Sequence, residues 1–316
     1  MSVDSRLSLS KLPLAARGAL ASVGTACFLL ALKGYAAWST DSVAMLGSLA
    51  DTALDLVASC VTLYGVHVAT IPADHDHRYG HGKAEALAAL FQVALIAVSA
   101  VGILWEAIRQ FGAPATTHDA GTGIGVSVAA IVVTLVLVAY QRRVIAQTGS
   151  VAVSADNVHY QSDLLLNVSV IVALVLDQVM HLRGADPVFG VLIALWLGWG
   201  ALRSAGSAID LLMDKEWPVE ERDRLIALIA DHPELRGLHD IRTRRSGTHD
   251  FVQFHMYVAP EMTVADAYEV VESVTERIHV AYPKADVLIH VDPGWRLDAN
   301  NPLIEPDVIG KPKERA

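Results

Sequence analysis

Two similar phrases inside apolar sequence place metal-binding side chains four residues apart. Each phrase begins with Ser-Val-Ala, and the side chains that follow are Asp51 and Asp55 in the first and His159 and Asp163 in the second. Residues at positions i and i+4 share one face of a helix. Two such helices side by side would offer three carboxylates and one imidazole, which is enough for a four-coordinate divalent metal ion.

Charged side chains are costly inside a bilayer, so these four need an explanation. One Asp near the centre of a spanning helix costs about 2.5–3.5 kcal/mol on insertion scales. A bound dication would relieve that cost, because it interacts with every carboxylate at once. The alternative is a structural cluster of hydrogen bonds between helices, to which Asn157 and Asn167 would contribute. The repetition of the pair favours transport of a metal ion or protons over that alternative.

The ligand types narrow the choice of metal ion. Carboxylate oxygens with one imidazole nitrogen suit zinc, cadmium or ferrous iron and tolerate manganese, whereas magnesium prefers oxygen ligands and retained waters. Such ligands must be deprotonated to bind a metal ion, so binding releases protons. The same residues would therefore carry metal in one direction and protons in the other.

Two further groups of residues have the composition of metal sites. A short polar segment contains Asp74, His77 and His81 in a D-x2-H-x3-H spacing, although a solvated polar loop would explain it as well. Near the C-terminus, His290 and Asp292 are two residues apart on a predicted strand and so share a face. His239 and His255 lie in or beside the neighbouring predicted strands, and scattered surface histidines are the alternative explanation there.

The composition is that of a membrane protein with a soluble part. Of 316 residues, 53% are hydrophobic and 18% are charged, and the mean hydropathy is +0.39. The net charge of −10 argues against a nucleic-acid partner. Six apolar runs are long enough to span a bilayer, at about 20 residues each; they lie near 17–38, 42–70, 84–110, 119–141, 154–180 and 187–212.

The distribution of cations predicts the orientation of the chain. Lys and Arg are concentrated before the first run and in the links that follow the second and fourth runs, and cytoplasmic segments are enriched in these residues. Both termini are therefore expected in the cytoplasm. We expect a tail over 1–16, a six-helix membrane domain over 17–212, a cytoplasmic domain over 213–295 and a disordered tail over 296–316.

The cytoplasmic domain is predicted to be a small α+β domain with the order α-β-β-α-β. A helix begins at about 218, strands follow at 237–245 and 249–259, a second helix covers 263–281, and a strand covers 287–292. Lys83, at the start of the third apolar run, and Asp214, after the sixth, are candidates for a charge pair at the membrane edge.

Three function classes could use metal-binding residues in a membrane protein. A proton-coupled exporter of divalent metal ions uses the paired ligands in the membrane. A membrane metallohydrolase would need a general base and an open coordination position, and the sequence has no H-E-x-x-H motif. In a metal-sensing scaffold the helices would be an anchor only, and an anchor has no need of paired ligands.

The chain resembles the cation diffusion facilitator family of metal-ion/proton antiporters, over roughly residues 15–295. The most specific marks are the two i, i+4 ligand pairs and the segment Tyr-Gly-His-Gly-Lys-Ala-Glu at 79–85. Within the family the chain is most similar to bacterial zinc, iron and cadmium exporters. The resemblance implies six helices, a cytoplasmic domain with a metallochaperone-like fold, a homodimer and a location in the bacterial inner membrane. A manganese-selective exporter of the same family is the alternative.

The resemblance also implies roles for individual residues. These are a transport site of Asp51, Asp55, His159 and Asp163, a loop site of Asp74, His77 and His81, a cytoplasmic site of His239, His255, His290 and Asp292, and an interface charge pair of Lys83 and Asp214. One departure is Tyr268, which stands where the family has a histidine, with Asp266 close by. The cytoplasmic domain would therefore bind one metal ion instead of two, or would use Asp266.

Overall fold

The chain forms two compact units, one ending at Asp210 and one beginning at Leu211. The computed structural model describes residues 12–40, 43–110, 123–180, 185–230, 232–235, 237–247 and 249–293. The tails predicted at the two ends therefore lie mostly outside the described residues. Each unit is considered by itself below.

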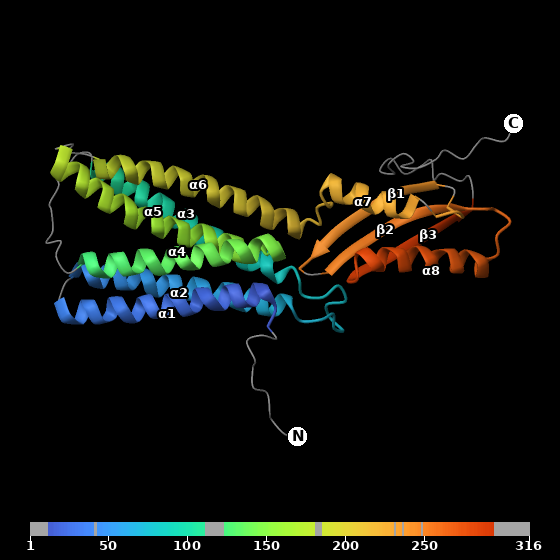
Figure 1. The fold of residues 1–316 in the computed structure, drawn as a ribbon, viewed down its shortest axis with the longest axis horizontal. Coiled ribbons are helices and arrows are strands. Elements are labelled where there is room, and N and C mark those ends of the chain that lie inside the picture. The colour runs from blue at the N-terminus through green and yellow to red at the C-terminus, as the bar shows by residue number, and fades with distance from the viewer. Residues whose placement is uncertain are drawn as a thin grey trace, which may run out of the picture. The chain divides into compact units, whose positions relative to one another are not determined.

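The first unit is a bundle of long helices (Figure 1). They are α1 (Leu14–Thr40), α2 (Val43–Ala69), α3 (Ala84–Gln110), α4 (Gly123–Thr148), α5 (Val151–Met180) and α6 (Ala185–Leu212). Each is long enough to cross a bilayer, at 1.5 Å rise per residue. Within the part of the chain that the structure describes, five of them are also apolar enough to be spans by composition.

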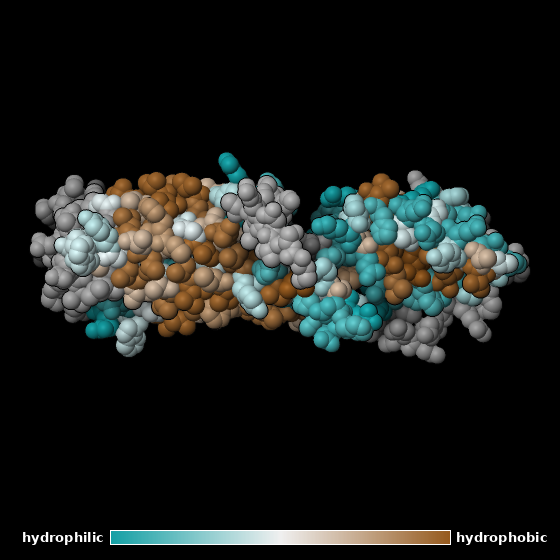
Figure 2. All heavy atoms as spheres, turned by 90° about the horizontal axis from the view of Figure 1, so that it is seen from below, coloured by the Kyte–Doolittle hydropathy of each residue, from teal (hydrophilic) through white to brown (hydrophobic). Residues whose placement is uncertain are grey.

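The surface of this unit is apolar where a bilayer would cover it. Large hydrophobic side chains such as Val98, Val136 and Leu202 are exposed on the outer faces of α3, α4 and α6. Figure 2 shows the resulting apolar surface along the helices. An apolar surface of this extent is unfavourable in water and is expected for helices surrounded by lipid.

The boundary between the fourth and fifth helices differs from the one expected. The fourth apolar run was expected to end at 141, but α4 continues to Thr148, because Gln141 and Val144 are buried in the bundle and hold another turn in place. Gly149 follows with φ of +64°, a backbone conformation that commonly ends helices. The fifth helix starts at Val151 instead of 154, and the Ser150 hydroxyl accepts from the Val153 N–H as a cap.

The helices pack through small residues. α1 packs against α2 and α4, and α5 packs against α3, α4 and α2. α6 lies close to α3 at Gly190, where an added Cβ would be 3.0 Å from that of Ala107, and close to α5 at Gly200, which faces Val158. Small residues at such crossings let helix backbones approach closely in a membrane.

The second unit has the predicted order α-β-β-α-β: α7 (Val219–Ala230), β1 (Gly237–Ser246), β2 (His249–Val258), α8 (Val264–Ala281) and β3 (Ala285–Pro293). The sheet order is β1-β2-β3, with β1 and β2 antiparallel and β2 and β3 parallel. The parallel pair needs a crossover, and α8 provides it. One core, containing Leu225, Phe254 and Ile278, joins both helices to the sheet.

We predict that Gly65→Ala destabilises the helical unit. A Cβ at Gly65 would lie 2.4 Å from the Cβ of Ala88, so α2 and α3 would have to move apart. Overpacking of this kind typically costs about 1–3 kcal/mol, and the thermal melting temperature in detergent should fall. The control is Gly102→Ala on α3, where nothing lies within 4 Å. Equal melting temperatures for the two variants would contradict the close contact.

Candidate metal-binding sites

The predicted ligands inside the helical unit come together where α2 meets α5. His159 Nε2 lies 2.9 Å from Asp55 Oδ1 and 3.8 Å from Asp163 Oδ2. One ligand atom from each of these residues lies within 4.8 Å of the others. The His159 side chain is 9% exposed, whereas those of Asp55 and Asp163 are 20% and 31% exposed. The arrangement is therefore a compact, partly open cluster of one imidazole and two carboxylates, which suits a divalent transition-metal ion.

Asp51 does not join that cluster. It lies one turn before Asp55 on α2 and is exposed, and its carboxylate is not among the clustered atoms. Four residues of helix amount to about 6 Å of rise. The structure thus brings three of the four predicted ligands together, and the role of Asp51 stays a prediction.

A second polar group, which the sequence analysis missed, is centred on Asp156 of α5. This carboxylate is fully buried and accepts from Gln92 Nε2 of α3 at 3.1 Å and from Gln141 Nε2 of α4 at 2.7 Å. Gln141 also donates to Ser22 Oγ of α1 and accepts from the Asn157 amide. Four helices are therefore joined through one buried carboxylate, three residues before His159.

A signal for this network was present in the sequence. Gln92 and Gln141 interrupt apolar runs, and polar side chains in spans are usually partnered inside the bundle. What the sequence did not show is that these residues and Asp156 point toward one another. Asn157, which was weighed as part of a structural cluster, does belong to the network, while Asn167 donates to the Asp163 carbonyl on its own helix.

The predicted loop residues form a compact group in the link between α2 and α3. The two carboxylate oxygens of Asp74 lie 3.4 Å from His77 Nδ1 and 3.4 Å from His81 Nε2. The loop is closed by Gly80 with φ of +75°, whose N–H donates to the His77 carbonyl. Among the described residues, the buried Nδ1 of His81 has no hydrogen-bond partner. One carboxylate and two imidazoles is a donor set that fits zinc.

Backbone donors hold the Asp74 carboxylate in its charged form. The His77 N–H donates to Asp74 Oδ1 at 2.6 Å and lowers the pKa of Asp74 below its ordinary value. The N–H of Asp76 acts in the same direction. The carboxylate therefore stays available as an anionic ligand in mildly acidic solution.

The soluble unit aligns its predicted histidines in one row across the sheet. His239 of β1 pairs in register with His255 of β2, which pairs with His290 of β3. Asp292 lies beside this row: its Oδ2 is 3.0 Å from His255 Nδ1 and 3.3 Å from His239 Nε2. The ligand atoms of these three residues lie within 4.8 Å of one another. His290 is more exposed and contacts the other oxygen of Asp292 at 3.4 Å, outside that closest group.

Tyr268, which departs from the family pattern, and the nearby Asp266 lie elsewhere. Asp266 forms a capping box with Thr263 at the start of α8, in which each side chain accepts from the backbone N–H of the other. Its carboxylate is therefore engaged in capping the N-terminus of the helix. Tyr268 is 66% exposed. Neither is part of the His239–His255–Asp292 group.

The predicted charge pair joins residues of different units, and the structure does not test it. Within the second unit, Asp214 Oδ1 lies 3.2 Å from Arg244 Nη1. Lys83 lies in the link before α3, next to His81. The pairing of Lys83 with Asp214 stays a prediction.

Comparison with known proteins agrees with both units. Residues 19–213 match the cation efflux transmembrane domain, and residues 217–294 match the cation efflux protein cytoplasmic domain. The cation-efflux pump FieF of Yersinia pestis (strain Pestoides F) is 40% identical over 275 residues, which are 87% of this chain and 91% of that pump. FieF of Yersinia pseudotuberculosis (serotype O:3, strain YPIII) gives the same values.

Among solved structures, the metal-bound C-terminal domain of the CzcD transporter from Thermotoga maritima is 27% identical and covers 26% of this chain and 100% of that domain, with a TM-score of 0.24.

Long apolar helices with metal-ligand side chains between two of them, followed by a small α+β unit, define a multi-pass membrane protein equipped to handle cations. The two domain matches and the 40% identity narrow this class to one family. The chain belongs to the cation efflux family, the cation diffusion facilitators, and the resemblance seen in the sequence is confirmed.

We predict that Asp156→Leu lowers the melting temperature of the helical unit. The change would leave the amide donors of Gln92 and Gln141 without their acceptor. Polar contacts between membrane helices are worth about 0.6–2 kcal/mol each, so a loss of about 1–3 kcal/mol is expected. Asp156→Asn, which keeps one acceptor oxygen, should have an intermediate effect.

The control for this variant is Glu106→Leu on α3. Glu106 is an exposed carboxylate that lies 3.8 Å from Arg109, and exposed pairs contribute little to stability. A melting temperature for Asp156→Leu equal to or above that of the wild type would show that the buried network does not stabilise the bundle.

Proposed function

We propose that the chain is a proton-coupled antiporter that exports divalent transition-metal ions from the cytoplasm, with zinc first and cadmium and ferrous iron next. The observation that carries the proposal is the cluster of Asp55, His159 and Asp163 between α2 and α5. A cation efflux pump needs a site inside its spanning helices that binds the ion reversibly. The likeness to FieF, itself described as a cation-efflux pump, supports the same assignment.

Asp51 is proposed as the fourth ligand, joining the cluster when an ion is bound. Zinc is most often four-coordinate, and the three clustered residues supply three ligand atoms. The i, i+4 spacing keeps Asp51 on the same face of α2 as Asp55. A binding site that is complete only around the ion would also release it more readily.

Proton coupling is proposed from the chemistry of the ligands. Carboxylate and imidazole groups bind metal only when deprotonated, so protons and metal ions compete for the same atoms. If the cluster is open alternately to the cytoplasm and to the outside, protons arriving from outside displace the metal, and metal arriving from inside displaces protons. Helical transporters achieve such alternating access around a fixed site near the middle of the membrane.

The other assignments belong to the same proposal. The membrane is the bacterial inner membrane, both termini and residues 213–295 are cytoplasmic, and the protein is a homodimer that uses Lys83 and Asp214 at its interface. Asp74, His77 and His81 would hold a metal ion in the loop. His239, His255 and Asp292, with His290, would hold a regulatory metal ion in the cytoplasmic domain. The donor sets of both fit zinc.

We expect Asp51→Ala and Asp55→Ala each to abolish export. Loss of an outer partner of a metal ligand typically costs about 10–100-fold, and loss of a ligand itself should cost more. The measurement is flux of zinc, cadmium, ferrous iron and manganese into proteoliposomes under a pH gradient. The control is Glu106→Gln, which removes an exposed carboxylate of α3 outside the cluster.

In the wild type, zinc flux should also require the pH gradient, and acidifying the side from which metal is loaded should slow it. Normal flux in both Asp variants, in protein that elutes like the wild type, would show that the transport site lies elsewhere. Zinc flux that does not depend on the gradient would contradict the antiport mechanism alone.

A separate prediction concerns the cytoplasmic domain. Asp292→Ala removes the carboxylate shared by His239 and His255, so the full-length protein should retain one zinc ion fewer per chain after dialysis. The matched control is Asp286→Ala, an exposed Asp on the same strand. Equal zinc content in the two variants, measured by mass spectrometry of the metal, would rule out a zinc site at Asp292.

A further inference from the structure

A cavity of about 550 Å³ opens where the end of α4, the start of α5 and the second half of α6 meet. Its charged lining residues are Arg142 of α4 and Arg203 of α6, and it has no Asp or Glu in its lining. Among the described residues, neither guanidinium forms an ion pair. The uncharged polar side chains of the lining are those of Ser150, Ser154, Ser204 and Ser207 and the amides of Asn157 and Gln161.

The charge of the residues that line this cavity is opposite to that of the carboxylates in the candidate metal cluster. Two unpaired guanidinium groups repel a dication, so the cavity does not suit the entry of metal ions. They attract an anion instead, and guanidinium groups with nearby hydroxyls are typical partners of a phosphate group. The cavity therefore has the chemistry of an anion site.

A second cavity of about 490 Å³ continues the first into the apolar part of the bundle. The two share Arg142, Gln161 and Trp196. Beyond these residues the lining of the second cavity is apolar, with Leu135 of α4 and Leu164 and Leu165 of α5. Along the two helices the lining thus changes from cationic and hydroxylated to aliphatic, which matches the two ends of an amphiphile and not a free phosphate ion.

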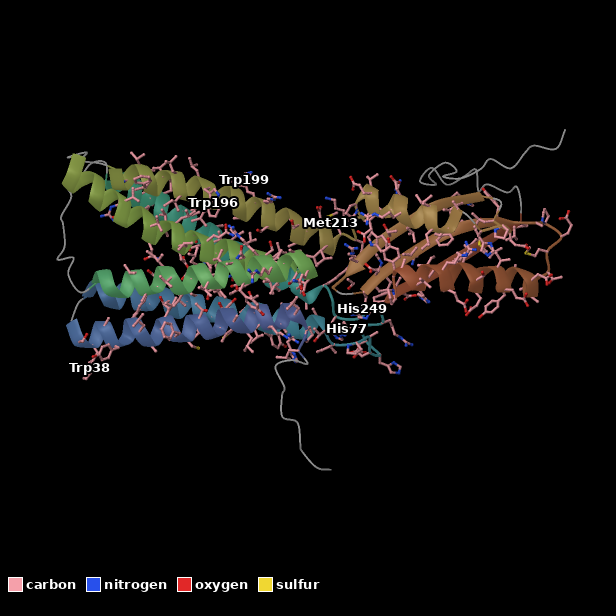
Figure 3. The ribbon with its side chains drawn as sticks, in the orientation of Figure 1. Trp38, His77, Trp196, Trp199, Met213 and His249 are labelled. Atoms are coloured by element: carbon pink, nitrogen blue, oxygen red, sulfur yellow. The ribbon has the colours of Figure 1, made fainter. Side chains whose placement is uncertain are left out.

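Two tryptophans of α6 form part of the wall of the polar cavity. Trp196 and Trp199 of α6 both line it, and both are labelled in Figure 3. The Arg203 guanidinium carbon lies 5.7 Å from the centre of the Trp199 ring, which is 60% exposed. The cavity also reaches Gly149 and Ser150 in the link between α4 and α5, so it extends to the helix ends, where lipid headgroups lie and where Arg side chains extend their charge.

We propose that this pair of cavities binds one anionic phospholipid. Its headgroup phosphate lies between Arg142 and Arg203, and one acyl chain occupies the aliphatic cavity beside Leu135 and Leu165. Basic pockets between membrane helices are suited to anionic headgroups. Asn157 and Gln161, which line the polar cavity, are hydrogen-bonded to each other, and Asn157 also donates to Gln141. The lipid would therefore contact the hydrogen-bond network around Asp156.

The test uses the full-length protein, freed of lipid in a mild detergent and titrated with phosphatidylglycerol while native mass spectrometry counts the bound lipid. We expect one phosphatidylglycerol per chain to bind more tightly than the rest. In Arg142→Gln/Arg203→Gln that binding should weaken by about tenfold or more, and added salt should weaken it in the wild type. Arg142→Lys/Arg203→Lys, which keeps both charges, should retain most of it.

The matched control is Arg143→Gln, because Arg143 is the exposed neighbour of Arg142 on α4 and does not line either cavity. Equal loss in the control and the double Gln variant would overturn the site. So would equal binding of phosphatidylcholine, which would indicate a general apolar surface. Full displacement of phosphatidylglycerol by millimolar inorganic phosphate would assign the polar cavity to a free anion and overturn the lipid.

Discussion

A buried carboxylate within the apolar bundle needs a partner there, and the arrangement of the helices follows from how α5 meets that requirement. One side of α5 presents Asp156 to amides from α3 and α4, and another presents His159 and Asp163 to Asp55 of α2. Because an unpaired charge in a low-dielectric interior costs several kcal/mol, α2, α3 and α4 are each held against α5 by a polar contact. Small residues such as Gly65 and Gly200 then allow the close packing around it.

The two polar groups on α5 differ in a way that suits different roles. Both oxygens of Asp156 already accept hydrogen bonds from neutral amides, and the carboxylate is fully buried. Hydrogen bonds to both carboxylate oxygens fix the position of this group. At the metal cluster, the acidic side chains are partly exposed and lie against an imidazole that can itself bind metal or protons. The fixed group thus positions the exchangeable one, about one helical turn away.

The sequence predicted the spacing of ligands along each helix or strand well, but it predicted poorly how each helix is rotated about its axis. The i, i+4 spacing predicted a cluster of Asp51, Asp55, His159 and Asp163, and the structure brings the last three together. Alternation along β3 placed His290 and Asp292 on one face. The position of Asp51 outside the cluster and the meeting of Gln92 with Asp156 depend on how each helix is turned about its axis. Hydrophobic periodicity determines that angle only weakly when a helix is apolar on all sides.

The row of histidines across the sheet illustrates the same limit. His239 pairs with His255 on one side of an irregularity in register, next to Asp240, whose φ of +49° is unusual for a residue other than glycine. A shift of one residue would place His239 on the opposite face of the sheet. Composition indicated that these histidines belong together, but only the bulge brings His239 beside Asp292.

The helical unit has one region whose side chains attract cations and another whose side chains attract anions. Acidic and imidazole groups occupy α2, the facing side of α5 and the loop after α2. The cavity among α4, α5 and α6 is lined by two guanidinium groups, and its described lining contains no Asp or Glu. A dication moving toward Asp55 would be attracted along the first set and repelled by the second. If a lipid phosphate neutralises Arg142 and Arg203, that repulsion is reduced. The charge of the cavity among α4, α5 and α6 therefore influences the approach of a dication to the metal cluster, even though the two sites share no ligand.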